Sequence, residues 1–448
     1  MRSLVYGLAV TGASTVRALA QRGHDVVVVD DQIDDAKRAL AAELGVELLT
    51  TPASLEALVG DCDLVSPSPG VPETHDVVAA ARRRGVPVRS EIELAYQWEQ
   101  DRPGGARPIL AITGTDGKTT TTLLAAAMLT AAGLRAVAAG NTDVPLVDAL
   151  DMELDAYVVE CSSFRLAWTE QFRANAALWL NLAPDHLNWH RSMATYEAAK
   201  ARLFDLQRPS DVAIGYVDDP VVMGHLDAAP ARHVTFGRST ADYHVDGDTL
   251  RGPTGTITTV ASMRRRLPHD ITNALAASAL VFESGLADLA TAGRAITAFV
   301  GPPHRIEPVG ERDGVQWFND SKATTPHAVA VAIHGFEHVV LIAGGRNKDL
   351  DLSPMAAEPQ RLRSVVAIGE SAAEIAELFA PHCTVVRADS MEAAVLAAAD
   401  AARRGDAVLL SPGCASFDWY PSGGYGARGD HFRRLVADLV DVREVGLR

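Results

Sequence analysis

A glycine-lined loop that ends in a lysine and a threonine carries the clearest chemical pattern in this chain. Residues 108–132 read PILAITGTDGKTTTTLLAAAMLTAA, in which Gly114 and Gly117 precede Lys118 and Thr119. A helix N-terminus and a glycine loop offer backbone N–H groups to an anion, while a lysine adds positive charge and a hydroxyl reaches Mg²⁺. The pattern therefore predicts a site for the phosphates of a nucleotide.

The segments around this loop support the same interpretation. Residues 109–113 form a short apolar run typical of a buried strand, and an alanine- and leucine-rich helical segment follows the loop. The general phosphate-loop pattern asks for a glycine where this chain has Ile112, so the loop is a shortened variant. The alternative is an ordinary glycine turn with a solvated lysine, but strand, loop and helix together favour a phosphate site.

Carboxylates and a histidine follow two further predicted strands. The strand at 156–159 ends in Glu160, the strand at 177–180 leads to Asn181, Asp185 and His186, and a helix at 193–204 carries Lys200. Mg²⁺ takes oxygen or imidazole ligands beside a phosphate loop. Taken singly, a strand-end acid is usually a solvated cap and Lys200 a surface lysine. His186 and His190 have a zinc-like spacing, but no glutamate follows His186, which argues against zinc.

The first hundred residues predict a Rossmann-like unit. A strand at 3–6, a turn with Gly7 and Gly12, a helix at 13–21 and a strand at 25–29 ending in an acidic pair fit that pattern. Ala9 occupies the place of the second fingerprint glycine, so a nicotinamide cofactor is weakly supported against another nucleotide-like ligand or a structural turn. A third strand at 63–65 enters the loop SPSPG, and the linker-like segment 100–108 follows.

The last third predicts another α/β unit with its polar residues at one sheet edge. Candidate strands span 315–318, 339–343, 365–368, 383–386 and 407–410. Three of the following loops are polar, namely 319–324, 344–348 and 411–416. Because the carboxyl ends of parallel strands meet at one edge, a ligand site there is favoured over three unrelated loops.

Composition limits the classes of function. The chain has 448 residues, 48% of them hydrophobic, which predicts about three globular domains. Its net charge of −16 and the lack of a basic block argue against nucleic acid or a membrane surface as a partner. The four cysteines show no paired spacing, which favours a reducing cytoplasm. No apolar run reaches the ~18 residues of a membrane helix.

Nine motifs in order resemble the Mur ligase family along the whole chain. They are TGTDGKTT, VVECSSF, NLAPDHL, YEAAKARLF, PHDITNALAA, GPPHRIE, NDSKATT, AGGRNK and LLSPGCASFD. The resemblance implies an α/β fold of three domains. These are a Rossmann-like UDP-sugar-binding domain over residues 1–104, a central ATP-binding domain with a mainly parallel sheet over 105–300, and a Rossmann-like amino-acid-binding domain over 301–448.

Within the family, the motifs are most similar to members that add D-glutamate to UDP-N-acetylmuramoyl-L-alanine in peptidoglycan precursor synthesis. In such members ATP phosphorylates the substrate carboxylate, and the amine of the amino acid attacks the acyl phosphate. The resemblance implies these three substrates as partners, two Mg²⁺ ions as cofactors, and a cytoplasmic monomer without nucleic-acid or membrane partners. Cell wall biogenesis, cell shape and cell division are the processes it implies.

The resemblance also implies a role for each matching residue. The expected catalytic residues are Lys118, Lys200, His186 and Lys348, with Lys200 carbamylated. The expected metal ligands are Thr119, Glu160, His186 and Lys200. The expected ATP contacts are Gly114, Thr115, Asp116, Gly117, Lys118, Thr119, Thr120, Asp270, Asn273, Arg305 and Asp320. The expected substrate contacts are Thr11, Asp31, Ser68, Gly70, Asn141, Ser162, Lys322, Thr324, Lys348, Ser416 and Tyr425, of which Tyr425 is placed by allowing a short insertion.

Four residues depart from the family pattern. Asp116 and Asp270 stand where asparagine is usual, Arg165 replaces a glutamine, and Gln32 replaces an arginine of some relatives. The alternatives within the family are a ligase that adds L-alanine or a diamino acid, and a folylpolyglutamate-synthase-like ligase, which would lack a domain such as residues 1–102. Outside it, a phosphate-loop motor ATPase and a dehydrogenase are the alternatives.

Overall fold

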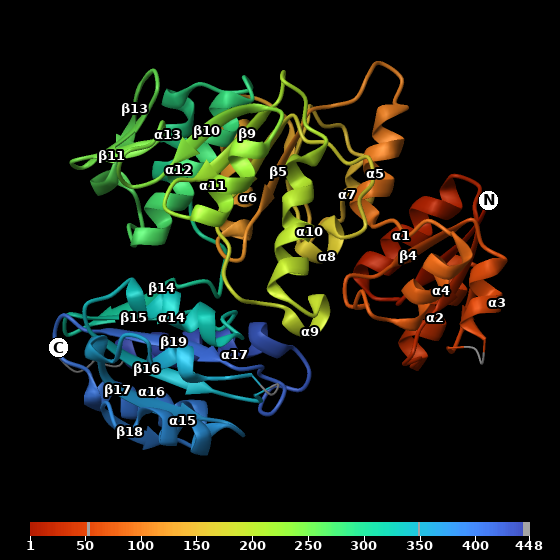
Figure 1. The fold of residues 1–448 in the computed structure, drawn as a ribbon. Helices are drawn as coiled ribbons and strands as arrows, with labels where there is room; N and C mark the ends of the chain where they lie inside the picture. Colours follow the sequence, from red (N-terminus) through yellow and green to blue (C-terminus); the bar gives the residue numbers. More distant parts are fainter. Residues whose placement is uncertain (52–53, 348–349, 442–448) are drawn as a thin grey trace. The chain divides into compact units, whose positions relative to one another are not determined.

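The computed structural model describes residues 1–51, 54–347 and 350–441 of the chain. It forms two compact units, residues 1–299 and 300–448 (Figure 1). The first unit contains both the N-terminal and the central parallel sheets, whereas the second unit contains one mixed sheet. The three predicted domain ranges therefore stay a prediction. Among the described residues, no helix combines the length and the apolar character needed to span a membrane.

The N-terminal sheet has four parallel strands in the order β3-β2-β1-β4. The strands β1, β2 and β4 correspond to the predicted ones, with β4 extending further than expected. The strand β3 is an addition, since its three residues are too few and too exposed to give a pattern. The elements are β1 (Arg2–Tyr6), α1 (Val10–Gln21), β2 (Asp25–Val29), α2 (Asp35–Leu44), β3 (Glu47–Leu49), α3 (Leu55–Gly60), β4 (Leu64–Pro67) and α4 (Asp76–Arg84).

The central sheet has six parallel strands in the order β10-β9-β8-β5-β7-β6, so the strand before the phosphate loop lies in its middle. All five residues of that strand, β5 (Ile109–Thr113), are buried, as expected for an apolar run covered by helices on both faces. The other strands are β6 (Ala136–Gly140), β7 (Ala156–Glu160), β8 (Ala176–Trp179), β9 (Val212–Tyr216) and β10 (Arg232–Phe236).

Helices cover this sheet, and a small antiparallel sheet follows it. The helices are α5 (Glu91–Gln100), α6 (Lys118–Ala131), α7 (Leu146–Ala149), α8 (Ser163–Leu166), α9 (Leu187–His190), α10 (Met193–Asp205), α11 (Pro220–Ala228), α12 (Pro268–Glu283) and α13 (Leu289–Ala298). The small sheet, β11-β12-β13, was not predicted; its strands are β11 (His244–Asp246), β12 (Thr249–Gly252) and β13 (Gly255–Thr259), followed by η1 (Val260–Ser262). Apolar side chains of α6, α12 and α13 pack together with the central sheet in one core.

The second unit has a six-stranded sheet in the order β14-β15-β19-β16-β17-β18, in which β14 alone is antiparallel to its neighbour. All five predicted strands are present. The strand β14 was missed because its sequence, EPVGER, lacks apolar alternation. Its turn into β15 contains Asp313 and Gly314, both with positive φ, which is the Asp-Gly hairpin signal.

The bounds in this unit are β14 (Glu307–Arg312), β15 (Val315–Asn319), α14 (Pro326–His334), β16 (Val339–Gly344), η2 (Ser353–Ala356), η3 (Pro359–Arg361), β17 (Leu362–Ile368), α15 (Ala372–Phe379), β18 (Thr384–Arg387), α16 (Met391–Ala401), β19 (Ala407–Gly413) and α17 (Gly424–Asp441). The polar loops after β15, β16 and β19 therefore leave neighbouring strands at one sheet edge, as predicted. The α/β fold class with mainly parallel sheets is confirmed.

Candidate active site

The phosphate loop joins β5 to α6 and depends on two glycines. Gly117 has φ 80°, and a Cβ added there would lie 2.6 Å from Asn273 Oδ1. Gly114 has φ 157°, and a Cβ added there would lie 2.9 Å from the Cβ of Leu180. Any side chain at either position would displace neighbouring atoms. The helix α6 begins at Lys118, so its first-turn N–H groups lie at the end of this loop and fit an anion.

Asn181 fastens the loop from the carboxyl side of β8. Its Oδ1 accepts hydrogen bonds from the backbone N–H groups of Thr115 and Asp116, each at 2.9 Å. Its Nδ2 donates to the carbonyl of Asp116 at 3.3 Å. Sequence analysis placed Asn181 at a strand end without a role, and the structure identifies it as the residue that fixes the loop's shape.

Two lysines converge on the carbonyl oxygen of Gly114. Lys118 Nζ lies 3.0 Å from that oxygen and 2.7 Å from the carbonyl of Thr115, while Lys200 Nζ lies 2.5 Å from Gly114 O. Lys200 is only 1% exposed, and its amine lies over the ring of Tyr196. Burial, assisted by the charge of Lys118, holds the pKa of Lys200 well below its usual range. Lys200 is therefore a buried residue at the loop, and the surface-lysine alternative is wrong.

Glu160, the last residue of β7, brings an incompletely bonded carboxylate into the central sheet. It is 1% exposed, and its Oε1 accepts a hydrogen bond from Asn141 Nδ2 at 2.7 Å. Its Oε2 is buried without a hydrogen-bond partner in the described part of the chain. A buried, unpartnered carboxylate oxygen is costly unless a cation completes it, so this group fits a divalent ion.

His186 lies at the start of α9 in the left-handed region, with φ 55°. Its ring packs against Phe164, and Nε2 is 3.2 Å from Asp185 Oδ2. Burial lowers the pKa of His186, and the positive charges of Lys118 and Lys200 act in the same direction. A neutral imidazole can act as a metal ligand.

The rest of the expected metal set is placed less directly. Thr119 and Thr120 follow Lys118 in the first turn of α6. His190, whose spacing from His186 had suggested zinc, is fully buried, and its Nε2 lies 2.9 Å from the Ser163 hydroxyl oxygen. Within residues 1–51, 54–347 and 350–441, no group of three or more His, Cys, Asp or Glu residues is arranged to hold a metal ion. The expected set draws on a hydroxyl and a lysine as well, so its ligand roles stay a prediction.

The start of α12 lies beside the phosphate loop. Asn273 Oδ1 is the atom that a Cβ on Gly117 would strike, which places this expected adenine contact at the loop. Asp270 accepts hydrogen bonds from the Arg265 guanidinium at 2.6–2.9 Å and from Leu267 N at 3.0 Å. The aspartate that replaces the family's asparagine is thus matched by a positive charge, which the sequence pattern had not suggested.

The expected sugar-nucleotide contacts lie in the first unit. Thr11, in α1, accepts a hydrogen bond from Arg165 Nη2 at 3.1 Å. Ser68 donates to the carbonyl of Gly7 at 2.6 Å, and Gly70 is exposed with open space around it. Asp31 accepts from the Tyr6 hydroxyl at 2.5 Å. Ser162, also expected there, is buried and caps α8.

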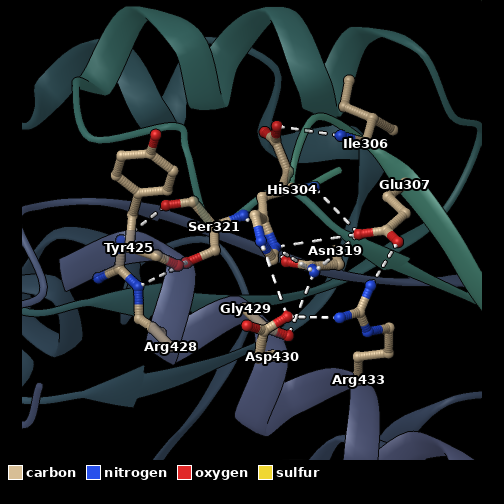
Figure 2. A network of polar contacts seen from close by, with 11 residues as sticks. His304, Ile306, Glu307, Asn319, Ser321, Tyr425, Arg428, Gly429, Asp430 and Arg433 are labelled. Carbon is tan, nitrogen blue, oxygen red and sulfur yellow. Dashed lines mark hydrogen bonds and ion pairs between the residues drawn. The ribbon is translucent and has the colours of Figure 1, made fainter. Parts of the chain in front are cut away.

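In the second unit, a polar network surrounds the backbone on both sides of Arg305 (Figure 2). His304 and Ile306 have φ 61° and 45°, a backbone conformation that residues other than glycine rarely adopt. His304 N donates to Glu307 Oε2 at 3.0 Å, and Ile306 N donates to Asp320 Oδ1 at 3.1 Å. Two carboxylates therefore hold the peptide that carries Arg305, an expected ATP contact.

Asn319 connects this network to α17. Its amide is fully buried and lies 2.9 Å from His304 Nδ1, 3.1 Å from Glu307 Oε2 and 3.2 Å from the carbonyl of Gly429. Asp320 is held in turn by the Ser411 hydroxyl at 2.7 Å. Of these residues sequence analysis expected only Asp320. His304, Glu307, Asn319 and Ser411 lie in three of the motifs and Gly429 in none, and nothing in the sequence indicated that they would meet.

The expected amino-acid contacts lie near the same edge of the second sheet. Lys322 Nζ is 5.2 Å from the ring centre of Tyr425, and Ser321 donates to the carbonyl of Tyr425 at 2.8 Å. Ser416 is buried, and Thr324 lies in the connection between β15 and α14. Lys348 lies outside the described residues. The structure thus brings Lys322 and Tyr425 together.

Comparison with known families matches three models to this chain. The model described as "Mur ligase MurD-like, N-terminal domain" matches residues 1–90, "Mur ligase middle domain" matches 112–281, and "Mur ligase, glutamate ligase domain" matches 304–414. Together they cover well over half of the chain.

Similar curated proteins match along nearly their whole length. A UDP-N-acetylmuramoylalanine–D-glutamate ligase of Frankia casuarinae is 43% identical, over 97% of this chain and 93% of that protein. One of the same name from Myxococcus xanthus is 37% identical, over 97% and 98% respectively.

Solved structures share the fold at low sequence identity. A MurF ligase of Thermotoga maritima, solved with ADP, has a TM-score of 0.62 at 14% identity, covering 97% of this chain and 95% of that one. The UDP-N-acetylmuramate-alanine ligase MurC of the same organism has a TM-score of 0.59 at 18% identity, covering 97% and 99%. The family models, the full-length relatives and the phosphate-loop geometry agree, and the chain belongs to the Mur ligase family.

Proposed function

We propose that this chain is an ATP-dependent ligase that joins D-glutamate to UDP-N-acetylmuramoyl-L-alanine in peptidoglycan precursor synthesis. The observation that carries the proposal is the match of 97% of the chain to proteins named as ligases of that substrate pair. The site supports the chemistry, because a phosphate loop with two converging lysines suits phosphoryl transfer.

The reaction proceeds in two balanced steps. A carboxylate oxygen of the sugar nucleotide attacks the γ-phosphorus of ATP, the bond to ADP breaks, and an acyl phosphate forms. The neutral amine of D-glutamate then attacks the acyl carbon, inorganic phosphate leaves with the bonding pair, and the amine loses a proton. Both steps need stabilisation of charge on phosphoryl oxygens.

The residues of the phosphate loop supply that stabilisation. The N–H groups at the start of α6 bind the phosphates, and the ammonium group of Lys118 exchanges its loop carbonyls for phosphate oxygens. Asn181 keeps the loop in shape while this exchange occurs. When bound, Mg²⁺ would neutralise phosphate charge, with Thr119, Glu160, His186 and Lys200 as the residues that would hold it.

Lys200 takes part as a carbamate in this proposal. A lysine whose pKa is lowered by burial has a neutral amine that can attack CO₂; an N–C bond forms, one C–O π pair moves to oxygen, and the amine releases a proton. The product is an anion in place of a cation, suited to share a divalent ion with Glu160. The free thiols of all four cysteines support a cytoplasmic setting, and we expect a monomer, which sedimentation will test.

The deciding experiment is ADP release with a panel of amino acids. At saturating ATP and UDP-N-acetylmuramoyl-L-alanine, D-glutamate should support rapid turnover, while L-glutamate, L-alanine, L-lysine and meso-diaminopimelate should not. The variant Lys118→Ala, which should release no ADP, controls for a contaminating ATPase. Faster turnover with L-alanine on UDP-N-acetylmuramate, or with a diamino acid, would refute the D-glutamate assignment and identify another ligase of the family.

A further inference from the structure

Arg165 occupies a buried position between three separate segments of the first unit. It lies in α8, directly after β7, and is 4% exposed. Its guanidinium donates from Nε to Glu91 Oε1 at 2.9 Å, from Nη1 to Asn141 Oδ1 at 2.6 Å, and from Nη2 to Thr11 Oγ1 at 3.1 Å. The planar fork of an arginine is suited to such divergent contacts, which a lysine could not make together.

Asn141 passes this arrangement on to the carboxylate of Glu160. Its Oδ1 accepts from Arg165 and its Nδ2 donates to Glu160 Oε1 at 2.7 Å, so both ends of the amide are used. A phosphate or carboxylate of a bound substrate would compete for the same Nδ2 donor. Such competition could rotate the Asn141 amide away from Glu160. The charged guanidinium of Arg165, which donates to Asn141 Oδ1, opposes this rotation, because a flipped amide would turn its nitrogen toward the guanidinium and its oxygen toward Glu160.

We propose that Arg165 is a positioning residue: it holds the Asn141 amide against Glu160 Oε1, so that Glu160 Oε2 stays available to a divalent cation. Through Thr11 the same guanidinium ties the cation contact to the first helix of the chain. The cation part rests on the metal expected for the proposed function, and the link to Thr11 rests on its sugar nucleotide. Removing a group that hydrogen-bonds a metal ligand, as Asn141 bonds Glu160, commonly changes metal affinity about 10- to 100-fold. Arg165 lies one hydrogen bond further out, so we expect the lower end of that range.

A purely structural role would give the same contacts a different meaning. Arg165 could serve only to neutralise Glu91, whose side chain is 1% exposed and which would otherwise be a buried, unpaired carboxylate. The two roles separate when both charges are removed together. The double variant Arg165→Met/Glu91→Gln removes both charges of this pair and retains a polar group near Val147 N, a backbone partner of Glu91.

The test measures two properties of the nucleotide-free protein, with every variant in the same bicarbonate buffer. Mn²⁺ binding is followed by the electron paramagnetic resonance signal of the free ion, and stability by the thermal unfolding midpoint. Arg165→Met should lower the midpoint and weaken Mn²⁺ binding about 10-fold. The double variant should recover much of the midpoint and keep the weakened Mn²⁺ binding. Arg165→Lys, with one ammonium group for three acceptors, should bind Mn²⁺ with intermediate affinity.

A second buried pair provides the matched control. Arg107 and Glu99 form a two-pronged ion pair in the same unit, with side chains 7% and 3% exposed, and neither side chain hydrogen-bonds a described residue assigned to the site. Arg107→Met should lower the unfolding midpoint and leave Mn²⁺ affinity unchanged. Parent-like Mn²⁺ affinity in Arg165→Met/Glu91→Gln would overturn the proposal and leave Arg165 as a counter-ion.

Calorimetry with UDP-N-acetylmuramoyl-L-alanine separates this inference from the proposed function. The parent should bind the sugar nucleotide, and the double variant should bind it more weakly because Thr11 loses its partner. If the parent does not bind this compound, the substrate assignment fails, while the Mn²⁺ comparison still decides whether Arg165 positions Glu160.

Discussion

The carboxyl edges of the two main sheets collect polar residues in different ways. At the edge of the central sheet, Glu160 Oε2 is buried without a hydrogen-bond partner among the described residues, and Lys200 is a buried amine with a lowered pKa. At the edge of the second sheet, Arg428 is equally buried, but its guanidinium donates to Ser321 Oγ, Ser321 O and Cys414 O. Glu160 therefore retains capacity for a ligand, whereas the guanidinium of Arg428 is bonded internally.

Backbone conformation differs between the phosphate loop and the turn around Arg305. The phosphate loop adopts its positive φ values at Gly114 and Gly117, where they cost little. The turn around Arg305 adopts them at His304 and Ile306, where each costs roughly 1–2 kcal/mol. Glu307 and Asn319 hold that strained turn by hydrogen bonds to His304 (Figure 2), and Asp320 accepts a further one from Ile306 N. The difference teaches that the phosphate loop is open to a ligand through glycine, whereas the turn around Arg305 is held in a strained conformation by its own hydrogen bonds.

The largest expected effect tests the carboxyl edge of the central sheet. Lys200→Ala removes the buried amine and the anion that we propose it becomes, and ADP release should fall roughly 10³-fold, as for loss of a main electrostatic group. Small carboxylic acids such as acetate should restore part of the rate by occupying the space of the carbamate. Steady-state ADP release with and without acetate measures both.

Lys118→Ala is the matched control for this rescue. This variant also loses a lysine that contacts the carbonyl oxygen of Gly114. Lys118 acts as a cation and not as a carbamate in this proposal, so acetate should not restore its activity. Full activity of Lys200→Ala would show that the buried lysine only supports the loop.

The second expected effect tests the carboxyl edge of the sheet in the second unit. Arg428→Met leaves the carbonyls of Ser321 and Cys414 without their buried donor, so the free energy of unfolding of the second unit should fall by roughly 2–5 kcal/mol. Burial already lowers the pKa of Arg428 to about 10, which indicates how strongly this position is desolvated. The loss is measured by unfolding the full chain in urea and using protease cleavage within the second unit to report how much of that unit is unfolded.

The same variant has a functional readout. Mn²⁺ binding at the first unit should remain unchanged, because none of its expected ligands lies in residues 300–448. An Arg428→Met protein as stable as the parent would show that the internal bonds of this edge contribute little, and the contrast between the two edges would fail.

Local patterns predicted the frame of this molecule well. Apolar runs between glycines and polar loops identified β5, β7, β8, β15, β16, β17 and β19, because such strands are largely buried on both faces, and they also identified the exposed edge strand β18. The edge strands β3, β6, β10 and β14 were missed, since half-exposed strands need no continuous apolar run, and the buried strand β9 was missed as well. The small sheet β11-β12-β13 was missed as well.

Single residues of the site were predictable by motif, whereas their partners were not. The loop glycines, Lys118 and Glu160 follow from the order strand, loop, ligand, and the family resemblance added Asn273 and Lys200. The clamp by Asn181, the pairing of Asp270 with Arg265, and the pairing of Arg165 with Glu91 join residues far apart or across a helix end. Nothing in a linear pattern encodes which charge will face which partner.

The smallest expected effect concerns His190, a titratable group of the first edge that the proposed chemistry does not use. Burial, together with the nearby charges of His186 and Lys200, lowers the pKa of His190 to about 4. Its pKa in the unfolded chain is about 6.5, so the unfolded state binds the proton more readily. Stability from a neutral His190 is therefore fully present above about pH 6.5 and is lost as the pH falls toward about 4.

Comparing the parent with His190→Gln isolates this contribution, because glutamine does not titrate and retains a group that can bond Ser163. The parent should lose roughly 1–3 kcal/mol more unfolding free energy than the variant between pH 7 and about 4.5, since each unit of pKa difference is worth about 1.4 kcal/mol. Urea unfolding at closely spaced pH values gives both curves. Parallel curves would mean that His190 is protonated equally in the folded and unfolded chains, and that the first edge is less desolvated than its buried histidine and lysine indicate.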